Sequence, residues 1–161
     1  MFKKLLTTRS LCASAVIAAL YAALTALLAP ISYGSIQCRI SEAFTLLPMV
    51  LPQAIPGLFV GCLIANLFSP MVTIWDILFG SMATLLAAIG TYALRRTPIL
   101  AAACPVIANG LIVGTVLSVT LNLPLALTMA EVALGELAAV AIGFALLTAI
   151  KRTKIDLSRL V

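Results

Sequence analysis

The stretch Ser32–Pro48, SYGSIQCRISEAFTLLP, is the polar interruption that decides the fold of an otherwise apolar chain. It opens with the turn residues Tyr33 and Gly34, and Arg39 and Glu42 follow three residues apart. Charged side chains are costly where a chain enters a membrane, so they usually pair with one another or mark a substrate pathway. Arg39 and Glu42 are therefore either a charge-neutralising pair or a pair that contacts a ligand.

The composition predicts a single integral membrane domain over residues 1–161. The chain is 63% hydrophobic and 9% charged, whereas soluble domains are about half apolar and a quarter charged. A spanning helix takes about 20 residues, so the length allows about six spans and almost no soluble domain. We predict an all-α protein with six transmembrane helices, at about 8–29, 38–51, 54–68, 73–94, 99–121 and 125–150.

The first two predicted spans differ from ordinary transmembrane helices. The basic N-terminus and the apolar run after it imitate a signal peptide, but further spans follow, so we interpret the run as a retained first span. The second span is short and is bounded or kinked by Pro48 and Pro52. It either starts below the membrane surface or is partly broken. We expect residues 30–37 to form an outer loop.

The basic residues sort by position along the chain. Three lie at the N-terminus, Arg95 and Arg96 lie between the fourth and fifth spans, and four follow the last span. The positive-inside rule then places both termini and this connection in the cytoplasm, which requires an even number of spans. We interpret the net charge of +5 as topology and adhesion to anionic lipid in the cell membrane, not as nucleic-acid binding.

The intramembrane polar residues cluster toward the outer side of this topology. Arg39 and Glu42 begin the second span, Asn66 ends the third, and Asp76 begins the fourth. Asn109 and Glu136 lie deeper. This distribution predicts a pocket open to the outside rather than a channel. As alternatives, the asparagines could join helices by hydrogen bonds, and Asp76 with Trp75 could be interfacial.

Glu131 and Glu136 lie five residues apart on the last predicted span, which is about 140° around a helix. They cannot both point into one small cavity, so one of them is structural or faces a partner. Glu136 is the costlier acid to bury and needs a partner such as Arg39 or a ligand cation.

Catalytic and metal-binding patterns are missing from the sequence. It contains no histidine, its four cysteines are scattered without ligand spacing, and no nucleotide-binding glycine loop is present. We predict no catalytic residues, no metal and no cofactor, so an ATP-driven process would need another polypeptide. The alanines of the first span form two rows at helical spacing, which suit either internal packing or docking of a separate membrane subunit. These rows are Ala15, Ala19, Ala23 and Ala18, Ala22, Ala26.

Several patterns in the right order resemble the QueT family, whose members are substrate-binding S components of energy-coupling factor (ECF) transporters associated with uptake of queuosine precursors. The resemblance covers nearly the whole chain, and its first pattern is long and specific. The patterns are YGxIQxRISEAxTxLP at Tyr33–Pro48, Gly57, Gly61 and Asn66, IWDILFGSMATLLAA at Ile74–Ala88, PVIANG at Pro105–Gly110, and Gly135-Glu136.

The resemblance implies a transport subunit without its own ATPase. Such a subunit pairs with a transmembrane coupling subunit and two cytoplasmic ATPases, and it topples in the membrane to carry its pocket inward. The candidate docking residues are Ala15, Ala19, Ala22, Ala23 and Ala26.

The ligand that the resemblance implies is a 7-deazaguanine, whose polar groups suit the candidate residues. The N1–H and 2-amino group of a 7-deazaguanine ring form a donor pair that one carboxylate can accept with both oxygens. O6 requires a donor, an aromatic side chain such as Tyr33, Phe44 or Trp75 could stack on the ring, and a cationic amine on some precursors would favour a second acid. The candidate substrate-binding residues are Tyr33, Gln37, Arg39, Glu42, Asn66, Asp76, Asn109 and Glu136.

Three alternatives stay open at this point. The cargo could be another vitamin or a nucleobase-like micronutrient. The chain could also be a standalone proton-coupled transporter driven by Glu131 or Glu136, or a purely structural membrane subunit.

Overall fold

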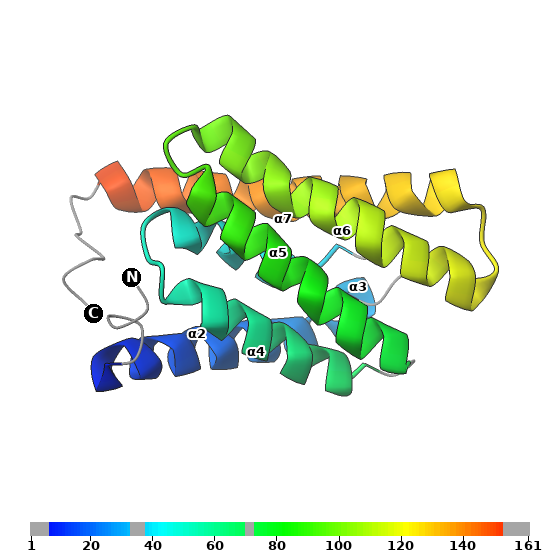
Figure 1. Ribbon diagram of the computed structural model, residues 1–161, viewed down its shortest axis with the longest axis horizontal. Helices are drawn as coiled ribbons and strands as arrows, with labels where there is room; N and C mark the ends of the chain where they lie inside the picture. Colours follow the sequence, from blue (N-terminus) through cyan, green and yellow to red (C-terminus); the bar gives the residue numbers. More distant parts are fainter. Residues whose placement is uncertain (1–6, 33–37, 70–72, 153–161) are drawn as a thin grey trace.

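The computed structural model describes residues 7–32, 38–69 and 73–152, and every regular element in these ranges is helical. Figure 1 shows the longer helices running along the length of the molecule, with α5 crossing between α4 and α6. The elements are α2 (Thr8–Leu27), α3 (Ala29–Ser32), η1 (Ile40–Met49), α4 (Ala54–Leu67), η2 (Asp76–Gly80), α5 (Ser81–Ala93), α6 (Pro98–Leu121) and α7 (Leu125–Arg152).

Four helical segments are long and apolar enough to cross a membrane. They are α2, the continuous η2–α5 segment, α6 and α7, while η1 and α4 are shorter apolar helices. The all-helical fold class is therefore confirmed, and the predicted spans match helices in order. Six spans and the placement of the termini stay predictions.

The structure adds detail to two predicted spans and corrects one predicted loop. The second predicted span is a ten-residue 3-10 helix, η1, with Pro48 inside it. The fourth predicted span begins with a π-helical turn, η2, before the α-helix starts. The predicted outer loop is wrong at its start, because Pro30 lies in the short helix α3, where the Ser32 amide donates to the Leu28 carbonyl at 2.8 Å.

Proline and a local side-chain hydrogen bond favour the 3-10 winding of η1. Pro48 has no amide hydrogen to donate, and its ring clashes with the carbonyl four residues earlier in an α-helix. The bonds at the two ends span three residues: the Glu42 amide donates to Arg39 and the Val50 amide donates to Leu47, both at 2.9 Å. Near the middle, Thr45 Oγ1 donates to the Glu42 carbonyl at 2.5 Å.

η1 lies at the centre of the bundle. It packs against α2, α4, α5, α6 and α7, and Ser41, Glu42 and Leu46 are buried. The Ser41 hydroxyl is 2.6 Å from that of Thr25 on α2, and the two share a hydrogen bond. At about 2 Å per residue the helix is roughly 20 Å long, shorter than the hydrocarbon core of about 30 Å.

Small residues allow the helix backbones to approach closely. A Cβ atom on Gly61 of α4 would lie 2.9 Å from the Ala18 carbonyl oxygen on α2, and a Cβ on Gly143 of α7 would lie 3.0 Å from the Ala43 Cα of η1. Only glycine fits at these two crossings without a shift. Ala18 and Gly61 therefore belong to an internal α2–α4 contact of the small-residue type.

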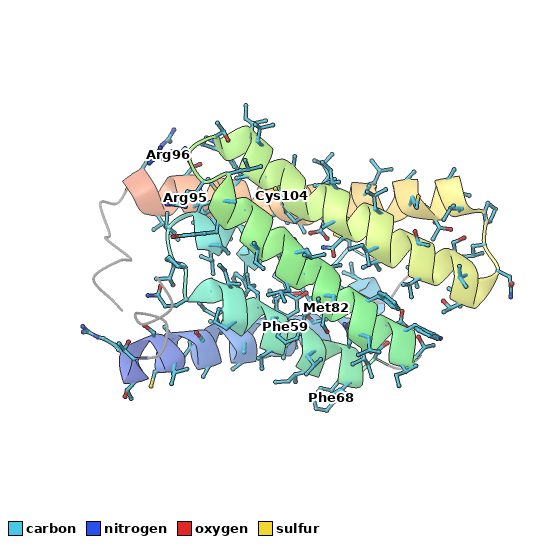
Figure 2. All side chains as sticks on the ribbon, viewed as in Figure 1. Phe59, Phe68, Met82, Arg95, Arg96 and Cys104 are labelled. Atoms are coloured by element: carbon cyan, nitrogen blue, oxygen red, sulfur yellow. The ribbon has the colours of Figure 1, made fainter. Side chains whose placement is uncertain are left out.

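The described arginines outside the core gather at one end of the molecule. In Figure 1 the start of α2 and the end of α7 lie at the same end, and Figure 2 shows Arg95 and Arg96 there, where α5 meets α6. Arg9 lies in the first turn of α2, and Arg152 ends α7. This grouping is what the positive-inside rule requires if that end faces the cytoplasm.

Candidate functional site

Four of the predicted substrate-binding residues line one small cavity between η1, α6 and α7. Arg39 caps the start of η1, Glu42 lies in its first turn, Asn109 comes from α6 and Glu136 from α7. Val113 and Val132 complete the wall. The space open to the centre of a water-sized sphere is about 10 Å³, which is room for about one water molecule.

The two carboxylate oxygens of Glu42 differ in their hydrogen bonds. The side chain is 1% exposed, and its Oε1 accepts a hydrogen bond from the Tyr21 hydroxyl and another from Thr84 Oγ1 at 3.1 Å. Oε2 has no hydrogen-bond partner among the described residues. Because two donors already occupy the lone pairs of Oε1, Oε2 is the atom that Glu42 can offer to a ligand.

Glu136 and Asn109 carry further unused polar atoms. Their side chains are 3% and 4% exposed, and neither Glu136 Oε1 nor Asn109 Nδ2 has a hydrogen bond of good geometry within the described ranges. The Asn109 amide nevertheless lies close enough to interact with both the Glu42 and the Glu136 carboxylates. A buried polar atom left unpaired costs about 1–3 kcal/mol, so this arrangement is better suited to a bound ligand than to bundle stability.

Arg39 supplies positive charge to the cavity. Its guanidinium attracts both the Glu42 and the Glu136 carboxylates, and its Nη1 lies 4.0 Å from Cys62 Sγ. Glu131 is half-buried and is not among the described residues that line the cavity. Glu136 is therefore the acid of the α7 pair that faces the candidate site, and the 140° separation explains why Glu131 does not face it as well.

Asn66 and Asp76 lie together but do not line this cavity. Asp76 Oδ2 accepts from the Thr73 amide at 3.2 Å and from Thr73 Oγ1 at 2.6 Å, which stabilises the start of η2. Asn66 Nδ2 donates to the Asp76 carbonyl at 3.1 Å and joins α4 to η2. Both side chains have a structural role here, and their predicted ligand role stays a prediction. Tyr33 and Gln37 lie outside the described residues.

Sequence reasoning missed the residues that hold Glu42. Tyr21 is fully buried on α2, and Thr84 Oγ1 on α5, which donates to Glu42 Oε1, also lies 3.3 Å from Cys62 Sγ. A buried tyrosine hydroxyl normally finds a hydrogen-bond partner, so a tyrosine in the middle of the first apolar span was a usable signal. Thr84 gave no comparable signal, because threonine hydroxyls in helices often bond their own backbone.

The two alanine rows of α2 face different surroundings. Ala15, Ala19, Ala23 and Ala26 are exposed, and Ala22 is half-buried. Ala18 is 5% exposed and packs against Gly61. Of the two interpretations of the alanines, internal packing applies to Ala18, whereas the exposed alanines are available to a partner.

A much larger, mostly apolar groove lies along α5 and α6. It has a volume of about 900 Å³ and is lined by side chains of η2, α5 and α6, among them Trp75, Phe79 and Met82. Figure 2 labels Met82 on α5. No charged residue lines it within the described part of the chain. Such a surface suits lipid chains, whereas recognition of a polar ligand needs the convergent polar groups of the smaller cavity.

One of three comparisons with known proteins found a match. Searches of curated proteins and of solved structures found no match to the chain. A family model described as QueT transporter matches residues 11–152, which include η1 and all four cavity-lining polar residues. With its apolar helices and its buried polar cavity, the chain belongs to the QueT transporter family.

Proposed function

We propose that this chain is the S component of an ECF-type importer and that it binds a queuosine precursor of the 7-deazaguanine type. The observation that carries the proposal is the group of unpaired polar atoms on Glu42, Asn109 and Glu136 in one cavity of a QueT transporter family member. Buried polar atoms without partners are uncommon in folded proteins, and a polar ligand would satisfy them.

The ring edge of a 7-deazaguanine fits this set of groups. Glu42 Oε2 has two free lone pairs, so this one oxygen can accept from both N1–H and the 2-amino group. This arrangement replaces the two-oxygen contact expected from the sequence, because Tyr21 and Thr84 occupy Oε1. Arg39 and the Asn109 amide are donors for O6, and Val113 and Val132 can contact the ring faces.

The cavity must widen before it can hold such a ring. Its present space admits about one water molecule, which is less than any bicyclic ring needs. Binding therefore separates η1 from the α6–α7 pair, or shifts these helices along one another.

Transport would need partner subunits. We propose that a transmembrane coupling subunit docks on the exposed alanines of α2, that two cytoplasmic ATPases supply the energy from ATP, and that the six-span topology with cytoplasmic termini holds in the cell membrane. The exposure of Ala15, Ala19, Ala23 and Ala26 supports this proposal, since small side chains let a partner helix approach closely.

Ligand identification tests the proposal directly. The protein is purified in mild detergent, and bound small molecules are released and identified by mass spectrometry. We expect a 7-deazaguanine, and recovery of an unrelated vitamin would remove the substrate assignment while leaving the architecture. Glu42→Gln should weaken binding by about 1.5–3 kcal/mol through loss of a charge-assisted contact, and Glu131→Gln is the matched control outside the cavity.

A standalone proton-coupled transporter is the second candidate, because two buried acids share a cavity with one guanidinium. Uptake in proteoliposomes that contain only this chain distinguishes the standalone transporter from the S component. Uptake that collapses with the proton gradient and needs no ATPase supports the second candidate. Uptake that appears only with the coupling subunit and ATPases supports the first.

A further inference from the structure

We propose that the ligand site extends beyond the small cavity into the contact between α4 and α5, where Asn66 and Ser81 bind an uncharged hydroxyl group on C7 of the ligand ring. This inference rests on the proposed function, because it assumes that a 7-deazaguanine occupies the cavity. It adds two atoms that determine specificity, the side-chain oxygen of Asn66 and the hydroxyl of Ser81.

Asn66 uses only one end of its side-chain amide within the bundle. Its Nδ2 donates to the Asp76 carbonyl at 3.1 Å and lies 3.5 Å from Cys62 Sγ. The Asp76 carbonyl fixes the orientation of the amide, because it accepts a hydrogen bond only from the nitrogen. Asn66 Oδ1 has no hydrogen-bond partner among the described residues, although the residue is 1% exposed. Asn66 therefore offers a buried acceptor.

Ser81, the first residue of α5, offers a buried hydroxyl. The residue is 1% exposed, and its Oγ has no partner within the described ranges. Serine and threonine hydroxyls in helices often donate to the carbonyl four residues earlier, as Thr148 does to Phe144 at 2.8 Å. In Ser81 that position falls within the π-helical turn η2, and the bond is not made. Such turns are frequent at functional sites.

Asn66 lies against the backbone just before Ser81. A Cβ atom on Gly80 would lie 3.0 Å from Asn66 Nδ2. A ligand group that enters here meets one acceptor, one hydroxyl and no charge. A hydroxyl is both a donor and an acceptor, so a single ligand hydroxyl can donate to Asn66 Oδ1 and accept from Ser81 Oγ.

The contact between α4 and α5 adjoins the residues proposed to hold the ring. Cys62, one turn before the asparagine on α4, has its Sγ 4.0 Å from Arg39 Nη1. Thr84, three residues after the serine on α5, donates to Glu42 Oε1 at 3.1 Å. Arg39 is a proposed donor for O6, and C7 lies on the same edge of the ring as O6. A substituent on C7 is therefore directed toward α4 and α5.

Two ligands of similar size test the inference. Binding of 7-hydroxymethyl-7-deazaguanine is compared with binding of 7-ethyl-7-deazaguanine by titration calorimetry on the full chain in nanodiscs. We expect the wild-type protein to prefer the hydroxymethyl ligand by about tenfold or more, as for two neutral hydrogen bonds. In Ser81→Ala the preference should fall to about threefold or less, and the affinity for the ethyl ligand should change by less than about twofold.

Protein stability distinguishes a ligand contact from a structural role. Because Ser81 Oγ has no partner among the described residues, Ser81→Ala should leave the melting temperature of the ligand-free protein unchanged or raise it. Ser118→Ala is the matched control, since this buried hydroxyl on α6 donates to the Leu123 carbonyl at 2.7 Å. The control should lower the melting temperature and leave the preference between the two ligands unchanged.

The outcomes separate this inference from the proposed function. Equal wild-type affinity for the two ligands, or a preference that persists in Ser81→Ala, overturns the inference and leaves the proposed function standing. A lower melting temperature in Ser81→Ala also overturns it, because the hydroxyl would then have a partner within the protein. Failure of both ligands to bind the wild-type protein refutes the proposed function and the inference together.

Discussion

Replacing Tyr21 by phenylalanine tests whether α2 positions the ligand-binding carboxylate. Tyr21 is fully buried and donates a hydrogen bond to Glu42 Oε1, where Thr84 is the second donor. The substitution removes the hydroxyl and keeps the ring, so packing against α4 is retained. Glu42 would then be free to turn, and a ligand would have to immobilise it on binding.

The expected loss of ligand affinity in Tyr21→Phe follows from the need to immobilise the Glu42 side chain on binding. Ordering one flexible side chain at a binding site costs about 0.5–1.5 kcal/mol, so the dissociation constant should rise by about 2- to 12-fold. The free energy of unfolding should fall by about 1.5–3 kcal/mol, because the lost bond is to a charged group. Titration calorimetry gives the first quantity, and denaturation of the detergent-solubilised protein gives the second.

Two controls decide whether Tyr21 acts through Glu42. Tyr92→Phe removes a hydroxyl near the arginine-rich end, where the ring lies beside Arg95, and should leave affinity unchanged. In a Glu42→Gln background, Tyr21→Phe should cost less affinity than in the wild type, because the carboxylate that it positions is gone. An equal cost in both backgrounds, or no cost in the wild type, refutes the positioning role.

Three further changes have outcomes that the structure predicts. Leucine at Ala19 and Ala23 should abolish co-purification with a coupling subunit and leave ligand affinity unchanged; retained co-purification would exclude this face as the docking site. Gly143→Ala should destabilise the protein more than Gly90→Ala, since the new Cβ meets the Ala43 backbone in the first case and the movable Cys104 side chain in the second; thermal unfolding compares them. Asp76→Ala should lower thermal stability by removing the bonds to Thr73 and change affinity less than about twofold; a large affinity loss would restore Asp76 to the site.

Polarity in an apolar chain explains why the residues of the candidate cavity could be predicted from the sequence. Arg39, Glu42, Asn109 and Glu136 are costly at membrane depth, so they stood out from the sequence and were expected in one pocket. Asp76 stood out for the same reason but bonds to Thr73, three residues away. Cost alone shows that a polar group needs a partner, and it does not show whether the partner is a ligand or a neighbouring residue.

The long helices could be predicted from the sequence, whereas the windings of η1 and η2 could not. Hydropathy and length identified α6 and α7 within two residues of their ends, because long apolar runs can satisfy their backbone only as helices. The same rule permits several helical windings, so it did not identify the 3-10 winding of η1 or the π-helical turn of η2. Pro48 predicted a broken segment, whereas the winding depends on contacts from five surrounding helices that no local pattern contains.

The winding of η1 has a consequence for how the cavity opens. A 3-10 helix longer than three or four residues is uncommon and marks strain or a hinge, and η1 keeps this winding over ten residues because the surrounding helices bury it. Its start carries Arg39 and Glu42, while Asn109 and Glu136 belong to α6 and α7, which contact each other closely where Gly110 faces Ala133. A shift of η1 thus moves two of the four polar groups away from the other two without separating α6 from α7. For this reason we expect ligand entry to require movement of η1, the segment that also contains the charged pair first identified in the sequence.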